Sequence, residues 1–463
     1  MSFLNSQKPI IKELISLLMQ KFEYASVLGT DVQGKRYFVS SKITTISDNS
    51  WAERGFVVRV YKGGRYFEYS VNEIEDIHKI TKEITDFVDI SIAGDYISYP
   101  KIVEQEIMES FNKPVKYALG GISPEKIIHK LRSIVEKAYT ITDKLVDFRV
   151  VLSTTHVSKI FISDKKDLCQ DYTWSEGYHI ALVRGNNATR QSSKSFSGLK
   201  GLELIDVLET GVDETVESAL KLLDAKTIVP GEYDVVFAPG IVGIIVHEAF
   251  GHGVEMDMFV KGRAKAIEYL NKEVASPLIN MRDGAKSCEQ VSSYLFDDEG
   301  TLGSDTLVIE NGVLKAGISD LLSALKLGSV PTGNGKRQNF EQKAYSRMTN
   351  TFFERGDSDY HDMIKSIKHG FFIEKASSGM EDPKDWGIQV MAVSAIEIID
   401  GKLTDNIYAP IVLTGYVPDL LKSISMVSGD FEMYGSGACG KGYKEWAKVS
   451  DGGPYIKAKA RLG

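Results

Sequence analysis

The stretch His247-Glu248-Ala249-Phe250-Gly251-His252 follows an apolar run from Val235 to Val246, and its two histidines flank a glutamate. Neutral imidazole is the commonest protein ligand for a catalytic divalent metal. A glutamate beside the first ligand is placed to take a proton from water that the metal activates. The pattern therefore predicts a metal site at the end of a buried helix.

The spacing of the two histidines imposes a geometric condition on that site. The familiar zinc-protease motif spaces its histidines by four, which puts both on one face of a helix. Here the spacing is five, and a regular α-helix would place the two rings roughly 140° apart. A π-bulge, or a helix that breaks at Gly251, would bring His247 and His252 together. The alternative is a pair of buried, hydrogen-bonded histidines without a metal.

A catalytic metal needs a third protein ligand, and the cysteines offer one. The chain has three, Cys169, Cys288 and Cys439. Only Cys439 lies in a glycine-rich loop, Gly435 to Gly442, in which the backbone can approach closely. Two histidines, one cysteine and a water match the ligand set of a catalytic zinc site.

The order of motifs from His247 onward resembles the TldD/PmbA family of metallopeptidases. In that family the two histidines and the late cysteine hold zinc and the glutamate is the catalytic base. The resemblance thus implies Zn²⁺ bound by His247, His252 and Cys439, with Glu248 as the base, as in the metal-bearing TldD-like subunit type. It covers nearly all of the second half and, weakly, Gly55 to Val60 of the first. The matching segments are His247 to Asp257, Asp297 to Gly300, Ile309 to Gly312, Thr332 to Arg337, Arg347 to Thr351 and Cys439-Gly440-Lys441.

The chain departs from the family pattern at two places. The family commonly has Gly-Gln shortly after Cys-Gly-Lys, where this chain reads Gly442-Tyr443-Lys444. The segment Met380 to Gly387 also differs from the usual glycine-rich segment. Both departures bear on substrate preference more than on metal binding.

Composition restricts the class of protein. The 463 residues are 43% apolar and 25% charged, which is typical of a globular protein with two or three domains. A net charge of −8 argues against a nucleic-acid surface, so the family's older description as gyrase modulators ranks low.

The cysteines and the apolar segments predict where the protein works. The three cysteines show no spacing typical of disulfide pairs, which predicts a reduced, cytoplasmic setting. Lys8, Lys12 and Glu13 interrupt the apolar N-terminus, so no signal peptide is expected. The apolar run before His247 is too short to cross a bilayer.

Blocks of hairpins and helices, without a steady βαβ alternation, predict an α+β fold. We expect two domains, a mixed helix and antiparallel-sheet domain over residues 1–228, and a mostly antiparallel β domain over 229–463 that carries the metal-site helix. Asn311-Gly312 and Asp400-Gly401 are strong hairpin signals. The helices expected from periodicity are an opening amphipathic helix around 10–18, and 72–87, 101–111, 124–139, 213–223, 318–327 and 361–369.

Several carboxylates near the motifs allow two interpretations. Glu255 and Asp257 either orient the metal ligands or face solvent. Asp297, Asp298 and Glu299 could form a second oxygen-ligand site, but a solvated hairpin turn is the favoured interpretation. The segment Gly333 to Arg337 lacks the spacing of a phosphate-binding loop, which favours a structural or substrate-facing loop.

The leading functional hypothesis is a zinc-dependent peptidase that cleaves unfolded or short peptides. A non-catalytic assembly or adaptor subunit with structural zinc is the alternative, and a modulator of DNA topology ranks third. We expect a homodimer or a heterodimer with a related subunit, without nucleic-acid or membrane partners. Substrate is expected to add as a strand to an exposed sheet edge inside an enclosed site. The weak candidates for that edge are the segment after Thr349 and Ile411 to Gly415.

Overall fold

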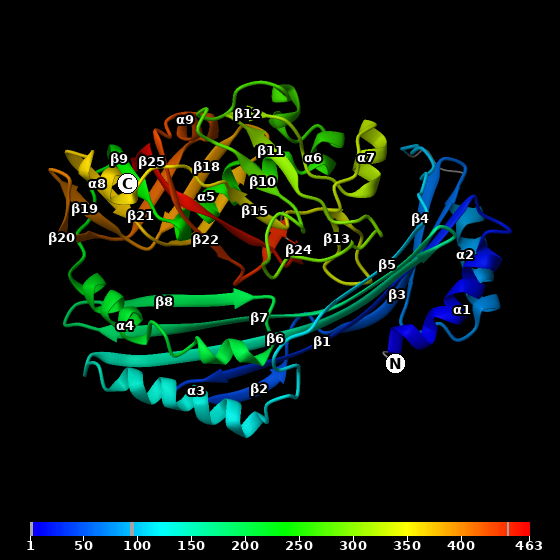
Figure 1. The fold of residues 1–463 in the computed structure, drawn as a ribbon, viewed down its shortest axis with the longest axis horizontal. Helices are drawn as coiled ribbons and strands as arrows, with labels where there is room; N and C mark the ends of the chain where they lie inside the picture. The colour runs from blue at the N-terminus through cyan, green and yellow to red at the C-terminus, as the bar shows by residue number, and fades with distance from the viewer. Residues whose placement is uncertain (1–2, 93–96, 442–443) are drawn as a thin grey trace.

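Two β-sheets organise the chain (Figure 1). The computed structural model describes residues 3–92, 97–441 and 444–463. An eight-stranded sheet comes from the first half of the sequence and a thirteen-stranded sheet from the second half. Nearly all neighbouring strands are antiparallel, and helices lie in blocks beside them, which confirms the α+β fold class. The expected boundary at residues 228/229 remains a prediction, although the first strand of the second sheet begins at Gly231.

The N-terminal sheet has the order β4-β3-β1-β6-β7-β5, with β2 paired to β1 and β8 to β7. The helix predicted for residues 101–111 is wrong, because residues 107–113 form a strand that pairs in parallel with β7. A free strand edge there outweighed the local helical pattern. The strands are β1 (Tyr24–Val39), β2 (Thr44–Asp48), β3 (Glu53–Lys62), β4 (Arg65–Val71), β5 (Ile107–Lys113), β6 (Leu145–Ser163), β7 (Lys166–Arg184) and β8 (Thr189–Gly198).

Helices cover one face of this sheet, and the C-terminal half covers the other (Figure 1). Neighbouring residues of β1 show the alternation: Val27 packs in the cluster with the first two helices, whereas Leu28 packs against Phe296 and Phe340. Two helices lie at each end of the sheet. They are α1 (Phe3–Leu18), α2 (Ile77–Ser91), α3 (Pro124–Tyr139) and α4 (Val212–Lys221), with short turns η1 (Leu202–Asp206) and η2 (Leu222–Asp224).

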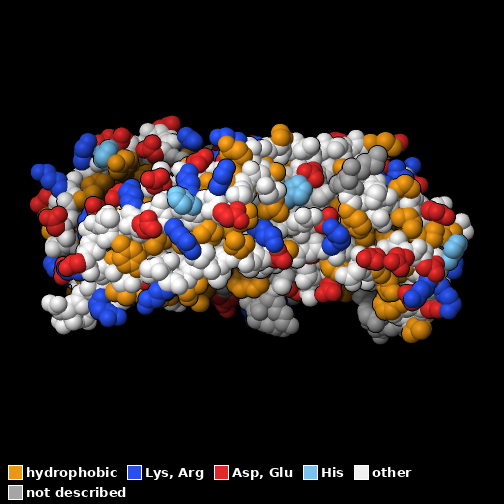
Figure 2. Space-filling model, turned by 90° about the horizontal axis from the view of Figure 1, so that it is seen from below, with side chains coloured by type: hydrophobic (Ala, Val, Ile, Leu, Met, Phe, Trp, Pro, Cys, Tyr) orange, Lys and Arg blue, Asp and Glu red, His pale blue; other side chains and the backbone are white. Residues whose placement is uncertain are grey.

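Figure 2 views the molecule from the helix-covered side. Basic and acidic side chains are interspersed along this face, and no continuous basic stripe is visible among the residues drawn in colour. The mixture agrees with the net charge of −8. A surface of this kind attracts phosphate backbones weakly, since nucleic-acid binding needs clustered Lys and Arg.

The C-terminal sheet is built around its last strand, β25 (Ser450–Leu462), which pairs with β9, β15, β21 and β22. Asn311-Gly312 and Asp400-Gly401 form the expected turns, with φ of 48°, 80°, 45° and 74° in that order. The other strands of the sheet are β9 (Gly231–Phe237), β10 (Met281–Asp283), β11 (Thr306–Glu310), β12 (Val313–Leu314), β15 (Asn350–Phe353), β16 (His369–Ile373), β17 (Ala376–Asp382), β18 (Gly387–Ala392), β19 (Ala395–Ile399), β20 (Lys402–Tyr408), β21 (Ile411–Tyr416) and β22 (Met426–Tyr434).

Short helices and two small strand pairs complete this half. None of the helices within the described ranges is long and apolar enough to cross a membrane. The small pairs are β13 (Gly335–Lys336) with β14 (Tyr345–Ser346), and β23 (Cys439–Lys441) with β24 (Lys444–Ala447). The helices are α5 (Pro239–Val246), α6 (Met256–Val260), α7 (Leu321–Leu327), α8 (Tyr360–Lys365) and α9 (Val417–Lys422), with short helical turns η3 (His247–Gly251), η4 (His252–Val254) and η5 (Lys265–Tyr269).

The sheet edges differ from expectation. Both candidate strands for substrate addition are interior, because β15 lies between β10 and β25, and β21 lies between β18 and β25. The choice of these two strands as the exposed edge is therefore wrong. Among the described strands, β17 pairs with β18 alone, so its other side is a free edge.

The favoured interpretation of Asp297, Asp298 and Glu299 is also wrong. They are only 2%, 7% and 2% exposed, because this turn packs on the N-terminal sheet instead of facing solvent. Lys159 of β6 donates to Asp298, and Arg59 of β3 donates to Glu299. Both cations come from far earlier in the chain, which is why the local sequence reads as a solvated turn.

Candidate metal centre

The two histidines lie at the end of α5, in a π-helical turn. Pro239 stands at the first turn of α5, where its missing N–H leaves no hydrogen bond unmade. The turn η3 is a π-helix, and the His252 N–H donates to the His247 carbonyl, five residues back. Gly251 lets Met348 pack closely on this turn, because a Cβ there would lie 2.1 Å from Met348 Sδ. Of the two arrangements that would bring the histidines together, a π-bulge or a break at Gly251, the structure has the π-helical turn.

Three donor atoms meet beyond this turn. Cys439 Sγ lies 3.2 Å from His247 Nε2 and 3.3 Å from His252 Nε2. One donor atom from each of the three residues lies within 4.8 Å of the donor atoms of the other two. The described part of the chain contains no second cluster of three or more His, Cys, Asp or Glu residues with this geometry. His247 and Cys439 are each 6% exposed. The structure therefore brings together all three residues expected to bind the metal.

The arrangement fits a tetrahedral zinc ion. With ordinary Zn–N and Zn–S bond lengths, tetrahedral geometry separates nitrogen from sulfur by about 3.5 Å. The two nitrogen–sulfur distances are close to this value. Both imidazoles direct Nε2 at the sulfur, which leaves each Nδ1 for a carboxylate. Metal-binding histidines are held in this way in most proteins.

Glu255 and Asp451 are the carboxylates beside the two Nδ1 atoms. Glu255 Oε2 accepts from His252 Nδ1 at 3.1 Å. Asp451 Oδ2 lies 3.6 Å from His247 Nδ1, within ion-pair range but longer than a hydrogen bond. Glu255 is 1% exposed, so it lies against His252 and does not face solvent. Asp257 is buried as well, but it receives a hydrogen bond from Lys441 instead of a histidine.

Cations around Glu255 keep it ionised despite its burial. Burial alone would raise its pKa, but Lys441, His252 and Arg347 outweigh this and hold the pKa well below its usual range. Burial would lower the pKa of His252, yet Glu255 and Cys439 raise it to about 10. Without a metal, both histidines are thus drawn toward the protonated form. A cation bound between the two rings and Cys439 would replace the proton on each Nε2 and leave the one on each Nδ1.

Cys439 is prepared to act as a thiolate. Burial would raise its pKa, but the neighbouring His247 and His252 lower it well below the usual value. Arg347 Nη2 donates to the Cys439 carbonyl at 2.7 Å, which fixes the backbone at this point. Thiolate is the form in which cysteine binds metal. Gly442 and Tyr443, where the sequence departs from the family pattern, lie outside the described residues.

Glu248 projects into a cavity beside the cluster. The cavity has a volume of about 840 Å³ and is lined by Glu248, all three candidate ligands, and residues of β17. Burial is the largest influence on Glu248 and raises the pKa of its carboxyl, while the two histidines oppose the shift. A base whose pKa is raised toward neutrality transfers protons more effectively near pH 7.

Glu381 of β17 is a site residue that sequence reasoning missed. Both carboxyl oxygens are buried without a hydrogen-bond partner. Burial raises the pKa of Glu381 well above its usual range. The positive charge of His252 opposes this shift, and the negative charges of Glu248 and Glu255 add to it. The one signal in the sequence was the departure from the glycine-rich family segment at Met380 to Gly387. Nothing local indicated that this segment returns to the metal helix.

Comparisons with known proteins identify the family. A model of the PmbA/TldA metallopeptidase C-terminal domain matches residues 230–460. A metalloprotease of Methanocaldococcus jannaschii is 28% identical over 96% of this chain and 100% of its own length. A protein named zinc metalloprotease TldD homolog, from Saccharolobus solfataricus, is 26% identical over 94% of this chain and 97% of its own. The chain belongs to the TldD/PmbA family.

Solved structures agree with this fold. TldE from Thermococcus kodakarensis superposes with a TM-score of 0.77 at 17% identity, over 97% of this chain and 99% of that one. A candidate DNA gyrase modulator from Thermotoga maritima gives a TM-score of 0.78 at 18% identity, over 98% and 100%. At these identities the likeness establishes the TldD/PmbA fold. The family's curated relatives are named metalloproteases, and the His-His-Cys cluster agrees with a metal-dependent family.

Proposed function

We propose that this protein is a zinc-dependent peptidase that cleaves unfolded or short peptides. One observation carries the proposal: the His247, His252 and Cys439 cluster opens onto a cavity of about 840 Å³ together with the Glu248 carboxylate. Structural zinc sites are closed by four protein ligands, whereas catalytic sites keep one position open. A three-ligand cluster beside a large cavity favours the catalytic type over an adaptor subunit.

The residues divide the chemistry between them. When bound, Zn²⁺ polarises the scissile carbonyl and lowers the pKa of water. Glu248 accepts the proton of the attacking water and delivers it to the leaving amine. Glu255 accepts a hydrogen bond from His252 Nδ1, and the Asp451 carboxylate faces His247 Nδ1, so both carboxylates favour the tautomer that leaves Nε2 free. The Glu248 carboxylate makes no hydrogen bond to another described residue, so it is available for this transfer.

The free edge of β17 is positioned to hold the substrate. Five consecutive residues of β17, Ser377 to Glu381, line the cavity, so its main chain as well as its side chains borders that space. An extended peptide added there would form main-chain hydrogen bonds without side-chain recognition. An exposed edge also invites aggregation, which favours enclosure of the site between two subunits. Such a site admits unfolded chains and excludes folded ones.

Glu248→Gln is the decisive test of the proposed chemistry. The amide keeps the shape of the side chain but cannot accept the proton, so kcat/KM for an unfolded peptide should fall by about 10²- to 10⁴-fold. Zinc content, measured by elemental analysis, should stay at the wild-type level. Chelation should abolish cleavage by the wild type, and added Zn²⁺ should restore it. Full activity in Glu248→Gln would remove this residue from the mechanism.

Substrate binding along β17 has its own test. Peptides N-methylated at alternate backbone amides lose the donors that a sheet partner needs, while their side chains are unchanged. One of the two methylation registers should raise KM by about tenfold, because a lost hydrogen bond is worth about 1 kcal/mol or somewhat more. The other register, which faces away from the edge, serves as the control. Equal KM values for both registers, or equal cleavage of a folded protein and its unfolded form, would contradict this arrangement.

A further inference from the structure

The loop that leads to Cys439 is hydrogen-bonded to the N-terminal sheet. The Gly435 N–H donates to Ser197 Oγ at 2.8 Å, and Ser436 Oγ donates to the Phe196 carbonyl at 3.1 Å. The Gly437 N–H donates to Glu176 Oε2 at 3.1 Å. Ser197 and Phe196 belong to β8, and Glu176 is the partner of Ser197 on β7. Both strands belong to the other sheet from the one that carries the metal helix.

Lys448 contacts both Gly437 and Glu176, and it lies just after β24, the second strand of the hairpin that carries Cys439. Its Nζ donates to the Gly437 carbonyl at 2.7 Å and to Glu176 Oε2 at 2.6 Å, 4.7 Å from the centre of the Trp174 ring. Lys448 directly follows Ala447, which is paired with Cys439 across β23 and β24. The Lys448 side chain is 8% exposed and that of Glu176 18%. Together they close the neck of the hairpin that carries Cys439.

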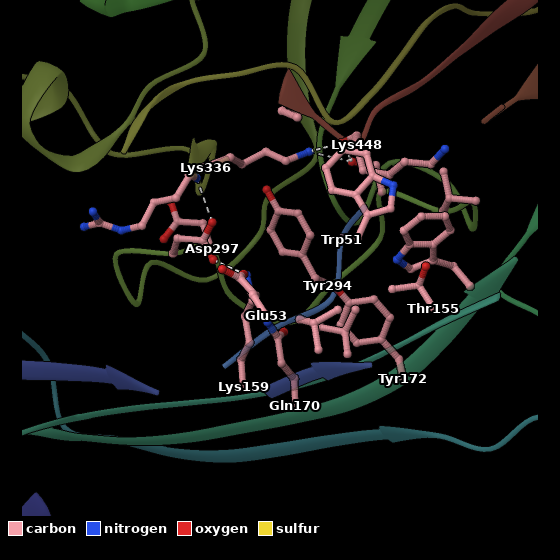
Figure 3. A pocket seen from close by; sticks show the side chains of 18 of the residues that line it. Trp51, Glu53, Thr155, Lys159, Gln170, Tyr172, Tyr294, Asp297, Lys336 and Lys448 are labelled. Atoms are coloured by element: carbon pink, nitrogen blue, oxygen red, sulfur yellow. Dashed lines mark hydrogen bonds and ion pairs between the residues drawn. The ribbon is translucent and has the colours of Figure 1, made fainter. Parts of the chain in front are cut away.

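The main chain of Lys448 is fixed as well. Its carbonyl accepts from Ser292 Oγ at 3.0 Å and from Lys336 Nζ. Figure 3 shows Lys336 reaching toward Lys448 above a cavity of about 90 Å³ that lies between the two sheets. Tyr294 and Trp51 stand below them in the same view. Lys448 is therefore held by backbone and side chain at once, which makes it a rigid anchor for Gly437.

We propose that Glu176 and Lys448 form a clamp through which the N-terminal sheet positions Cys439 for metal binding. Gly437 has φ of 104°, a backbone conformation that glycine adopts readily and other residues rarely adopt. A glycine loop without restraints samples many other backbone conformations as well. The clamp binds both the N–H and the C=O of Gly437, two residues before the sulfur. Retention of metal then depends on contact between the two sheets. Only the zinc measurement below rests on the proposed function.

The first test uses the metal-free protein, so it does not depend on zinc. The variants Glu176→Ala and Lys448→Met free Gly437, and local opening of the loop should raise the alkylation rate of Cys439 by about tenfold. Mass spectrometry follows Cys439 and, as an internal reference, Cys169. Lys113→Met is the matched control, because it removes an ion pair to Glu289 that also joins the two halves of the chain. Unchanged Cys439 rates in both clamp variants would overturn the proposal.

The second test measures release of zinc to a chromophoric chelator. Loss of a residue that supports a metal ligand typically costs 10- to 100-fold in metal affinity, so Glu176→Ala should release zinc about tenfold faster or more. Glu176→Gln should lie between it and the wild type, because its amide oxygen still accepts from Gly437 while the charge that attracts Lys448 is gone. Faster release in Lys113→Met to the same extent would show general loosening and contradict the clamp. A wild-type protein without zinc would refute the proposed function, and the alkylation rates would still decide on the clamp.

Discussion

At the scale of single residues, a chain of charges lies behind His252 in the candidate metal centre. His252 is held by Glu255, and Glu255 is held in turn by Lys441 at 3.0 Å, with Arg347 Nε at 3.6 Å. All of these groups are largely buried, so each charge is compensated by its neighbour and not by water. The same arrangement keeps His252 Nδ1 occupied, which leaves Nε2 directed at Cys439.

Glu255→Gln tests this chain. The amide is neutral, so it orients His252 less firmly and withdraws the negative charge that makes the ring a stronger ligand. We expect zinc affinity to fall by about 10- to 100-fold, measured by competition with a chelator of known affinity. Asp257→Asn is the control, because Asp257 contacts Lys441 and Lys261 but neither histidine. Equal losses in the two variants would show that the lysines, and not the histidine contact, set the affinity.

At the scale of elements, β17 and the π-helical turn fit against each other closely. A Cβ at Gly379 would lie 2.5 Å from Glu248 Cγ and 2.9 Å from Ile244 Cγ2. The absence of a side chain at this position thus sets the distance between the strand edge and the base. The strand and the turn meet only because Gly379 is small.

Gly379→Val should displace Glu248 and lower kcat/KM at least about tenfold, since misplacing a catalytic group by about 1 Å can cost two orders of magnitude. Zinc content should be unchanged, because the atoms nearest to a Cβ at Gly379 belong to Glu248 and Ile244 and not to a candidate ligand. Gly387→Val in β18 is the matched control, with open space around its Cβ position. Activity that falls equally in both variants would mean that the hairpin, and not Glu248, was disturbed.

The sequence predicted those features that depend on residues close together in the chain. The histidine spacing of five indicated that the helix must depart from regular α geometry, by a π-bulge or a break at Gly251. The paired turn residues located hairpins, and the glycines around Cys439 indicated a loop of close approach. Asp451, the edge of β17 and the clamp at Glu176 were not predictable in this way. Each of them acts on the site from a strand that is distant in the sequence, and nothing around Glu176 in β7 indicates a partner near residue 448.

At the scale of the whole molecule, the two sheets are joined by buried ion pairs. Lys159 of β6 pairs with Asp298, and Arg59 of β3 pairs with both Glu68 and Glu299. Burial would raise the pKa of Asp298, but Lys159 outweighs it and holds the pKa below its usual value. The turn that was expected to be solvated is therefore a principal contact between the halves.

Asp298→Asn should lower the free energy of unfolding by about 3 kcal/mol at pH 7, because it leaves Lys159 buried without its partner. The pH dependence follows from the lowered pKa. The contribution of Asp298 is fully present above its unfolded pKa of about 3.9 and is lost as pH falls through the lower folded pKa. The gap between wild type and variant should thus be constant near neutrality and shrink below about pH 4. Denaturant titrations of metal-free protein at several pH values would measure it, and a gap that widens in acid would contradict the assignment.

The π-helical turn accommodates one residue more between the two histidines than the familiar zinc-protease motif has. Deleting Ala249 would shorten the spacing of the histidines from five to four, and on an ordinary α-helix a spacing of four puts both rings on one face. The chain beyond His252, however, would turn back by roughly 100°, carrying Glu255 away from Lys441 and Gly251 away from Met348. Both spacings solve the same coordination problem, but only the longer one matches the rest of this chain. The extra residue of the π-helical turn is thus matched to its surroundings, and its removal would require compensating substitutions at the contacts of Glu255 and Gly251.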